Sequence, residues 1–87
     1  MKSVALKFLP DSDKAPRVIA SGDGYLGYLI YKLGKSKNVP IEKNPELAEF
    51  LSQVPVGEEI PENLYLAVAK IFAFLDNLEK DLIHEDT

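Results

Sequence analysis

The sequence contains no cysteine and no tryptophan, and it has a single histidine in 87 residues. Without cysteine there is no disulfide framework and no thiolate ligand for a metal ion. With one histidine, neither a histidine-rich metal site nor a Ser-His-Asp triad is easily built. No apolar run approaches the roughly 18–20 residues of a membrane-spanning helix, and the apolar stretch near Met1 is too short for a signal peptide. We therefore expect a cytoplasmic protein without direct membrane insertion.

Basic residues are also scarce, since ten Lys and Arg stand against fourteen Asp and Glu, for a net charge of −4. This balance disfavours nucleic acid as a partner, because such binding draws its affinity mainly from Lys and Arg contacts to phosphate. The remaining composition, 46% hydrophobic and 28% charged, is typical of a globular domain. A chain of this length has room for one compact core.

Hydrophobic periodicity predicts an α/β (α+β) domain, with a small mixed sheet of about three strands packed with three to four helices. The expected order is strand, strand, helix, strand, helix, helix, over residues 4–9, 17–21, 23–35, 39–41, 45–54 and 61–83. We place the domain at residues 1–78. Residues 79–87 are charged, and we expect either a helical extension or a frayed tail there.

Two of the expected helices carry clear local signals. Leu26, Leu29, Ile30 and Leu33 recur at the spacing of a buried stripe in the first helix. The segment Asn44-Pro45-Glu46 is a strong start for the second, with Asn at the cap, Pro at the first helical position and an acid in the first turn.

The segment Gly22–Gly27 fits the pattern G-x-G-x-x-G between a predicted strand and a predicted helix, which is typical of dinucleotide-binding turns. Asp23 would bring a negative charge to the pyrophosphate, and the chain has room for only one of the two halves of such a domain. We favour a structural interpretation, in which the glycines permit a sharp turn and Asp23 caps the helix. Nucleotide binding stays as an alternative.

No pattern of residues indicates an active site. His84 lies in a charged stretch without a supporting acid, and we expect it at the surface. The residues therefore favour a binding or assembly module over an enzyme, with no cofactor and no metal.

Five segments, taken together and in order, resemble the cytoplasmic domain of the FlhB-type switch protein of flagellar and related type III secretion. The resemblance covers about residues 3–78. The segments are Val4–Phe8, Ala15–Gly22, Val39–Ile41, Asn44–Ala48 and Gly57–Ala69.

In that family a membrane-embedded part precedes the domain, which cleaves itself within an Asn-Pro-Thr-His sequence. Cleavage accompanies a change of export specificity from rod and hook proteins to filament proteins. This chain has no Asn-Pro-Thr-His, and Met1 stands about where the histidine of that motif would be. The resemblance thus implies a free-standing counterpart of the post-cleavage fragment, without the cleavage reaction.

The resemblance also implies a docking patch for short hydrophobic motifs of early export substrates. The matching positions are Ala15, Pro16, Ala69 and Phe72. Leu is commoner in the family at the position of Phe72, so a narrower pocket is expected. The alternative is that Ala69 and Phe72 simply pack the core.

The family's first strand belongs to the pre-cleavage fragment and completes the sheet. We therefore expect an unfilled strand position here, which a membrane-bound FlhB-type partner could fill. The implied function is that of a non-enzymatic component of the export apparatus, cytoplasmic or peripheral to the export gate at the inner membrane. A cytoplasmic adaptor that uses the same fold outside export is the alternative.

Overall fold

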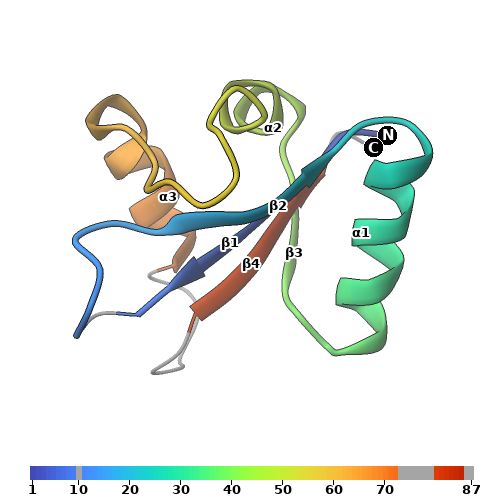
Figure 1. Ribbon diagram of the computed structural model, residues 1–87, viewed down its shortest axis with the longest axis horizontal. Helices are drawn as coiled ribbons and strands as arrows, with labels where there is room; N and C mark the ends of the chain where they lie inside the picture. Colours follow the sequence, from blue (N-terminus) through green and yellow to red (C-terminus); the bar gives the residue numbers. More distant parts are fainter. Residues whose placement is uncertain (10, 73–79, 86–87) are drawn as a thin grey trace.

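The computed structural model describes residues 1–9, 11–72 and 80–85. In chain order the elements are β1 (Ser3–Phe8), β2 (Arg17–Gly22), α1 (Tyr25–Ser36), β3 (Ile41–Lys43), α2 (Pro45–Leu51), the 3₁₀ turn η1 (Glu62–Leu64), α3 (Tyr65–Phe72) and β4 (Lys80–Glu85). The predicted class, a small mixed sheet packed with helices, is confirmed (Figure 1).

The four strands form one sheet in the order β2-β1-β4-β3. β1 pairs antiparallel with both β2 and β4, whereas β3 pairs parallel with β4. The short polar loop between the first two strands predicts their antiparallel pairing, and this is confirmed. The brief third strand lies at the sheet edge, as its preceding Pro40 predicts.

Strand β4 overturns the prediction of a helical extension or a frayed tail over residues 79–87. Lys80–Glu85 is a strand with neighbours on both sides. Ile83 and His84 are 3% and 0% exposed, and consecutive strand residues point to opposite faces, so both faces of β4 are covered. Charged residues flank Ile83 and His84, so the local sequence pattern does not indicate a strand. The strand conformation depends on pairing with β1, which is far away in the sequence. The third helix predicted for residues 61–83 is α3 as far as Phe72, and its later apolar positions lie outside the described residues.

The sequence does not indicate which strand borders the expected unfilled position. β1 does not border it, because β1 pairs with β2 along one side and with β4 along the other. In the described part of the chain, the position beside β1 is thus filled from within the same chain.

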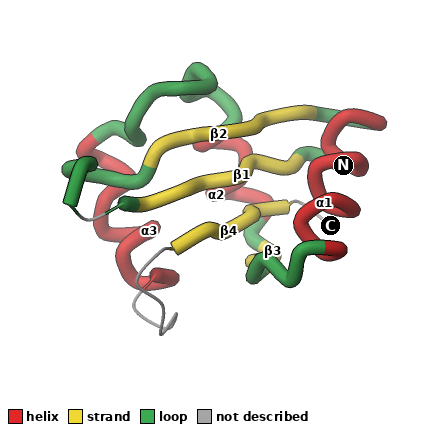
Figure 2. Tube along the Cα trace, turned by 60° about the horizontal axis from the view of Figure 1, so that its bottom comes forward, coloured by secondary structure: helices red, strands yellow, loops and turns green. Residues whose placement is uncertain are grey.

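The main core lies between the sheet and the helices α2 and α3, which lie behind the sheet in Figure 2. Its buried members come from β1, β2, α2, the segment before η1, and α3. They are Val4, Leu6, Ala15, Val18, Leu47, Leu51, Ile60, Leu64 and Val68. Because residues alternate along a strand, Ala5 of β1 points to the other face, where α1 packs.

Helix α1 does not bury the stripe that its leucines predict. Its buried residues are Gly27 and Gly34, whereas Leu26 and Leu33 are more than half exposed. A Cβ at Gly27 would come within 2.1 Å of the Met1 carbonyl oxygen, and one at Gly34 within 2.0 Å of the Ile83 side chain. The two glycines therefore let the helix approach the sheet closely on a face that the spacing of apolar residues does not indicate.

The end of α1 is a Schellman motif. The Val39 amide donates to the Gly34 carbonyl at 2.9 Å, and the Asn38 amide donates to the Lys35 carbonyl at 3.2 Å. Asn38 has φ 59°, the left-handed conformation that Asn tolerates and that this motif requires. By residue type, Gly34 and Asn38 are both plausible exit residues of this helix. The structure uses Asn38 and keeps Gly34 within the helix.

The start of α2 confirms the prediction from Asn44-Pro45-Glu46. The Asn44 side-chain oxygen accepts a hydrogen bond from the Leu47 amide at 3.1 Å. We expect Asn44→Ala to lower the free energy of unfolding by about 1 kcal/mol, because one amide of the first turn loses its partner. Urea denaturation measures this change. Asn44→Ser serves as the control, since Ser also caps helices, and an equal loss in both variants would contradict the role of the cap.

Candidate functional site

The four predicted docking residues differ in how far the structure exposes them. Ala15 is 2% exposed and belongs to the core cluster together with Val68. Pro16 is half-buried, and Ala69, next to Val68 on α3, is exposed. Phe72 ends α3, and its side chain lies outside what the structure describes. Ala15, which precedes β2, and Val68 of α3 thus belong to the same buried cluster, and Ala69 follows Val68 on the exposed side of the helix.

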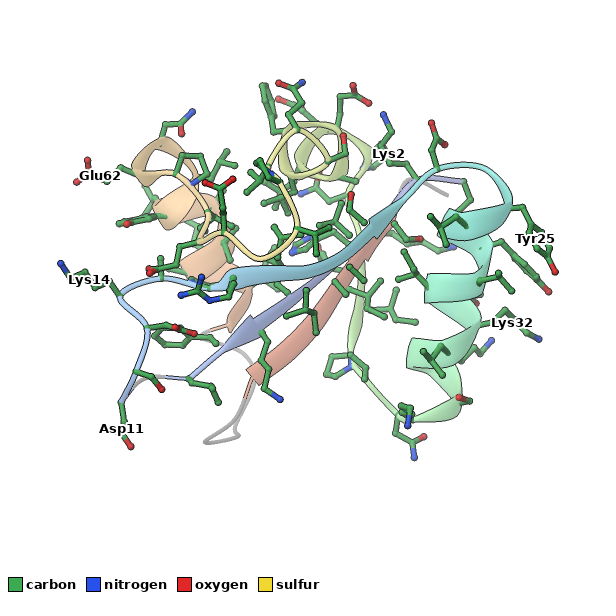
Figure 3. The ribbon with its side chains drawn as sticks, viewed as in Figure 1. Lys2, Asp11, Lys14, Tyr25, Lys32 and Glu62 are labelled. Carbon is green, nitrogen blue, oxygen red and sulfur yellow. The ribbon has the colours of Figure 1, made fainter. Side chains whose placement is uncertain are left out.

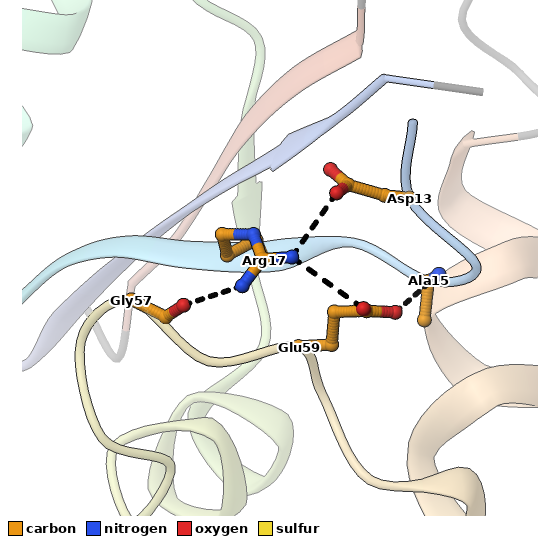
Figure 4. A network of polar contacts seen from close by, with 5 residues as sticks. All are labelled: Asp13, Ala15, Arg17, Gly57 and Glu59. Atoms are coloured by element: carbon orange, nitrogen blue, oxygen red, sulfur yellow. Dashed lines mark hydrogen bonds and ion pairs between the residues drawn. The ribbon is translucent and has the colours of Figure 1, made fainter. Parts of the chain in front are cut away.

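A polar network holds the chain just before β2 (Figure 4). Glu59 accepts a hydrogen bond from the Ala15 amide at 2.9 Å, and its other oxygen lies 3.4 Å from Nη2 of Arg17. The same Nη2 lies 3.1 Å from Oδ1 of Asp13. Nη1 of Arg17 donates to the Gly57 carbonyl at 2.6 Å. These contacts fix the backbone around Ala15 and Pro16.

Backbone hydrogen bonds reinforce the same attachment. The Val18 amide donates to the Glu58 carbonyl at 2.9 Å, and the Gly57 amide donates to the Val18 carbonyl at 2.7 Å. The Ile60 amide donates to the Pro16 carbonyl at 2.9 Å. The segment from Gly57 to Ile60 thus runs along the outer side of β2 and leads directly into η1 and α3. A break in this attachment would move α3 relative to Ala15.

None of the charged residues in this network is among the predicted docking residues. Asp13 and Arg17 are four positions apart, whereas Arg17 and Glu59 are 42 positions apart in the sequence. No local spacing relates Glu59 to the other two. The one signal in the sequence is that Arg17 and Glu59 both lie in segments that carry the family resemblance.

The exposed surface next to the docking residues is apolar. On α3, Tyr65 and Leu66 are 39% and 70% exposed. Both share a helix face with Ala69, which follows them by four and three positions. An apolar strip on a helix surface, with a small residue at its end, is suited to receive an apolar side chain of a peptide. The arrangement is suited to binding an apolar group.

The Gly22–Gly27 segment has a structural role in this fold. Gly24 is the N-cap of α1 with φ 62°, and Asp23 accepts a hydrogen bond from the Gly24 amide at 2.8 Å. The expectation that Asp23 caps the helix is wrong. The N-cap residue is Gly24, and no side chain caps the first turn. The strands on either side of α1, β2 and β3, lie at opposite edges of the sheet, whereas a dinucleotide turn needs adjacent parallel strands.

The structure also corrects the prediction that His84 lies at the surface. It is fully buried, not exposed, and neither ring nitrogen has a hydrogen-bond partner in the described part of the chain. Burial lowers the pKa of His84 to about 4, because the charged imidazolium loses its hydration. His84 is directly opposite Val4 of β1, so it shares a sheet face with core residues.

Among the described residues, no group of three or more His, Asp or Glu side chains is placed to hold a metal ion. No helix in the described ranges has the length and apolar character to cross a membrane.

Comparison with known proteins gives matches over most of the chain. The model of the FlhB HrpN YscU SpaS family matches residues 2–75. Protein YlqH of Bacillus subtilis (strain 168) is 42% identical over 81 residues, which are 93% of this chain and 87% of YlqH. The flagellar biosynthetic protein FlhB of Aquifex aeolicus is 40% identical over 84% of this chain. FlhB of Escherichia coli (strain K12) is 37% identical over 90% of it. The matched region spans 21% of each of these two FlhB proteins, about a fifth of their length.

Proposed function

Because this chain belongs to the FlhB HrpN YscU SpaS family, we propose that it is a non-enzymatic component of a flagellar or type III protein export apparatus. It would stand in for, or supplement, the post-cleavage fragment of the export switch protein and dock export substrates. Its place would be the cytoplasm, peripheral to the export gate at the inner membrane, with a membrane-bound FlhB-type protein as a partner.

The observation that carries this proposal is the pattern of coverage. The chain matches one fifth of FlhB but most of YlqH, a protein of similar length. The domain therefore occurs both within a longer flagellar biosynthetic protein and in a small protein. The shared sequence in the two settings supports a shared role in export, and that role depends on the docking residues rather than on the fold.

The docking surface would be the junction of Pro16 and α3. Ala15 is buried and would support the surface from below, while Ala69 and half-buried Pro16 would contact the substrate's apolar side chain. Phe72 would close one end. The Arg17–Glu59 network would hold the two halves of this surface in register.

We expect Ala69→Glu to weaken binding of a peptide with the hydrophobic motif of an early export substrate at least tenfold. A carboxylate there would be desolvated by the apolar side chain that docks beside it. Fluorescence anisotropy with a labelled peptide measures the affinity. Because Ala69 is exposed and Glu favours helices, the Tm is expected to stay unchanged. Lys43→Ala, an exposed change on β3, is the matched control.

The function itself is tested by complementation. The chain is supplied to a cell whose switch protein is truncated after the Asn-Pro of its cleavage motif, and secreted hook and filament proteins are measured. Restored export that Ala69→Glu abolishes would support the proposal. No restoration, with the protein folded and present, would favour the adaptor outside export.

A further inference from the structure

The described part of the chain leaves the leucine stripe of α1 partly exposed. Leu26, Leu29 and Leu33 are 54%, 42% and 58% exposed, and their spacing of three and four residues places them along one side of the helix. The buried glycines hold a different side of α1 against the sheet. A continuous apolar stripe on a helix that is already packed by another face indicates a surface for a second molecule.

The stripe borders an apolar pocket of about 220 Å³ between α1 and the sheet. Leu33 and Lys37 line it from the helix side, Ile19 and Ala20 from β2, and Ile83 from β4. The irregular register between β1 and β2 at this point leaves Ile19 46% exposed. The pocket is smaller than the roughly 300–1,000 Å³ that encloses a small-molecule ligand, so it suits one or two inserted side chains.

The charged residues of α1 and its C-cap are all basic, and Asp23 lies just before the helix. In a chain of net charge −4, the segment 25–37 carries Lys32, Lys35 and Lys37 and no acid. Lys32 lies over the Tyr28 ring and Lys35 over the Tyr31 ring, at 5.9 Å and 5.6 Å from the ring centroids. Lys37 is the charged residue among those that line the pocket. Figure 3 shows Lys32 pointing away from the sheet, so its charge is available to a molecule lying along α1.

We infer that the leucine stripe and the adjoining pocket, together called the α1 groove, bind an acidic amphipathic helix of a partner protein. An apolar side chain of that helix enters the pocket beside Leu33, and its carboxylates lie against Lys37 and Lys32. The leucine stripe covers two turns of α1, and an amphipathic helix can lay apolar side chains at i, i+3, i+4 and i+7 against such a surface. The concave pocket favours a side chain over a flat lipid surface, which has nothing to insert into it.

The groove is separate from the proposed docking surface. The core cluster that contains Ala15 and Val68 lies under α2 and α3, whereas the pocket lies under α1 against the other sheet face. The domain would therefore hold two partners at once, one on each face of its sheet.

The test uses the full chain and a fluorescein-labelled model helix with leucines at i, i+3, i+4 and i+7 and glutamates on its flanks. A second peptide replaces each glutamate by lysine. Fluorescence anisotropy is expected to show saturable binding of the glutamate peptide, at least tenfold tighter than that of the lysine peptide. The difference should shrink as salt is raised, because the paired charges are near the surface.

Two variants assign the binding to the groove. Leu33→Asp and Lys37→Glu are each expected to weaken binding of the glutamate peptide at least tenfold. Lys70→Glu makes the same charge change at an exposed position of α3 and is expected to leave the affinity unchanged. All three side chains are at or near the surface, so urea denaturation should confirm that the variants remain folded.

Three results would overturn the inference. The first is no binding of the glutamate peptide, or equal binding by Lys37→Glu and the unchanged protein. The second is binding to vesicles of phosphatidylglycerol without peptide binding, which would assign the face to a membrane. The third is self-association that Leu33→Asp abolishes, which would make a second copy the occupant.

Discussion

A chain that ends at residue 79 is expected not to fold into the native domain. β4 is the neighbour of β1 along its whole length and the strand to which β3 pairs. Its removal opens the sheet between β1 and β3 and takes away the buried side chains of Ile83 and His84. Truncation of one buried isoleucine alone costs about 2–5 kcal/mol. A domain of 87 residues has a total stability of only about 4–13 kcal/mol.

The measurement is far-UV circular dichroism with a thermal melt on chains 1–79 and 1–85. The chain 1–85 retains β4 and is the matched control, expected to melt like the full protein. Ile83→Pro tests the same point without shortening the chain, since the Ile83 amide donates to the Pro40 carbonyl at 3.0 Å and proline has no such donor. A chain 1–79 with the Tm of the full protein would show that β4 is dispensable.

Acidification from pH 7.5 to pH 5 is expected to lower the free energy of unfolding by about 2 kcal/mol through His84 alone. Burial lowers the pKa of His84 to about 4 in the folded state, against about 6.5 in the unfolded chain. Between these values the unfolded state binds the proton and the folded state does not. Stability is therefore present above about pH 6.5 and is lost as the pH falls toward 4.

His84→Leu isolates this contribution. Leucine carries no titrating group, so the slope of stability against pH between 7.5 and 5 should be shallower in the variant by about 2 kcal/mol over that range. The many carboxylates of the chain contribute equally to both proteins and cancel in the comparison. The variant should also be more stable at neutral pH, because it removes two buried nitrogens that have no hydrogen-bond partner among the described residues. Parallel slopes from urea denaturation at each pH, or an NMR titration of His84 near pH 6.5, would contradict the assignment.

The acid sensitivity and the truncation concern the same strand. β4 places the buried imidazole of His84 on the core side of the sheet and Ile83 on the side of the α1 pocket. It thus contributes to both faces at once. A change in β4 is expected to affect the core and the α1 groove together, whereas Ala69→Glu and Leu33→Asp each affect one surface.

Local signals in the sequence predicted what depends on neighbouring residues. Asn44-Pro45-Glu46 begins α2 as expected, because a cap satisfies backbone amides three residues away. Asn38 ends α1 for a similar reason, since its left-handed conformation is a property of that residue and its immediate neighbours. The alternation in β1 and the polar loop after it correctly predicted the first hairpin.

The sequence alone therefore determined the family, the fold class, the antiparallel pairing of β1 with β2, the start of α2 and the exit of α1. The two helix ends depend on residues within a few positions of one another. Tertiary structure decided which face of α1 is buried, because two glycines fit closer to the sheet than leucines can. It also decided that Lys80–Glu85 is a strand and that His84 is buried, because β1 offers an unpaired edge that this segment fills. Such pairing joins residues almost a whole chain length apart, and no periodicity within the segment records it.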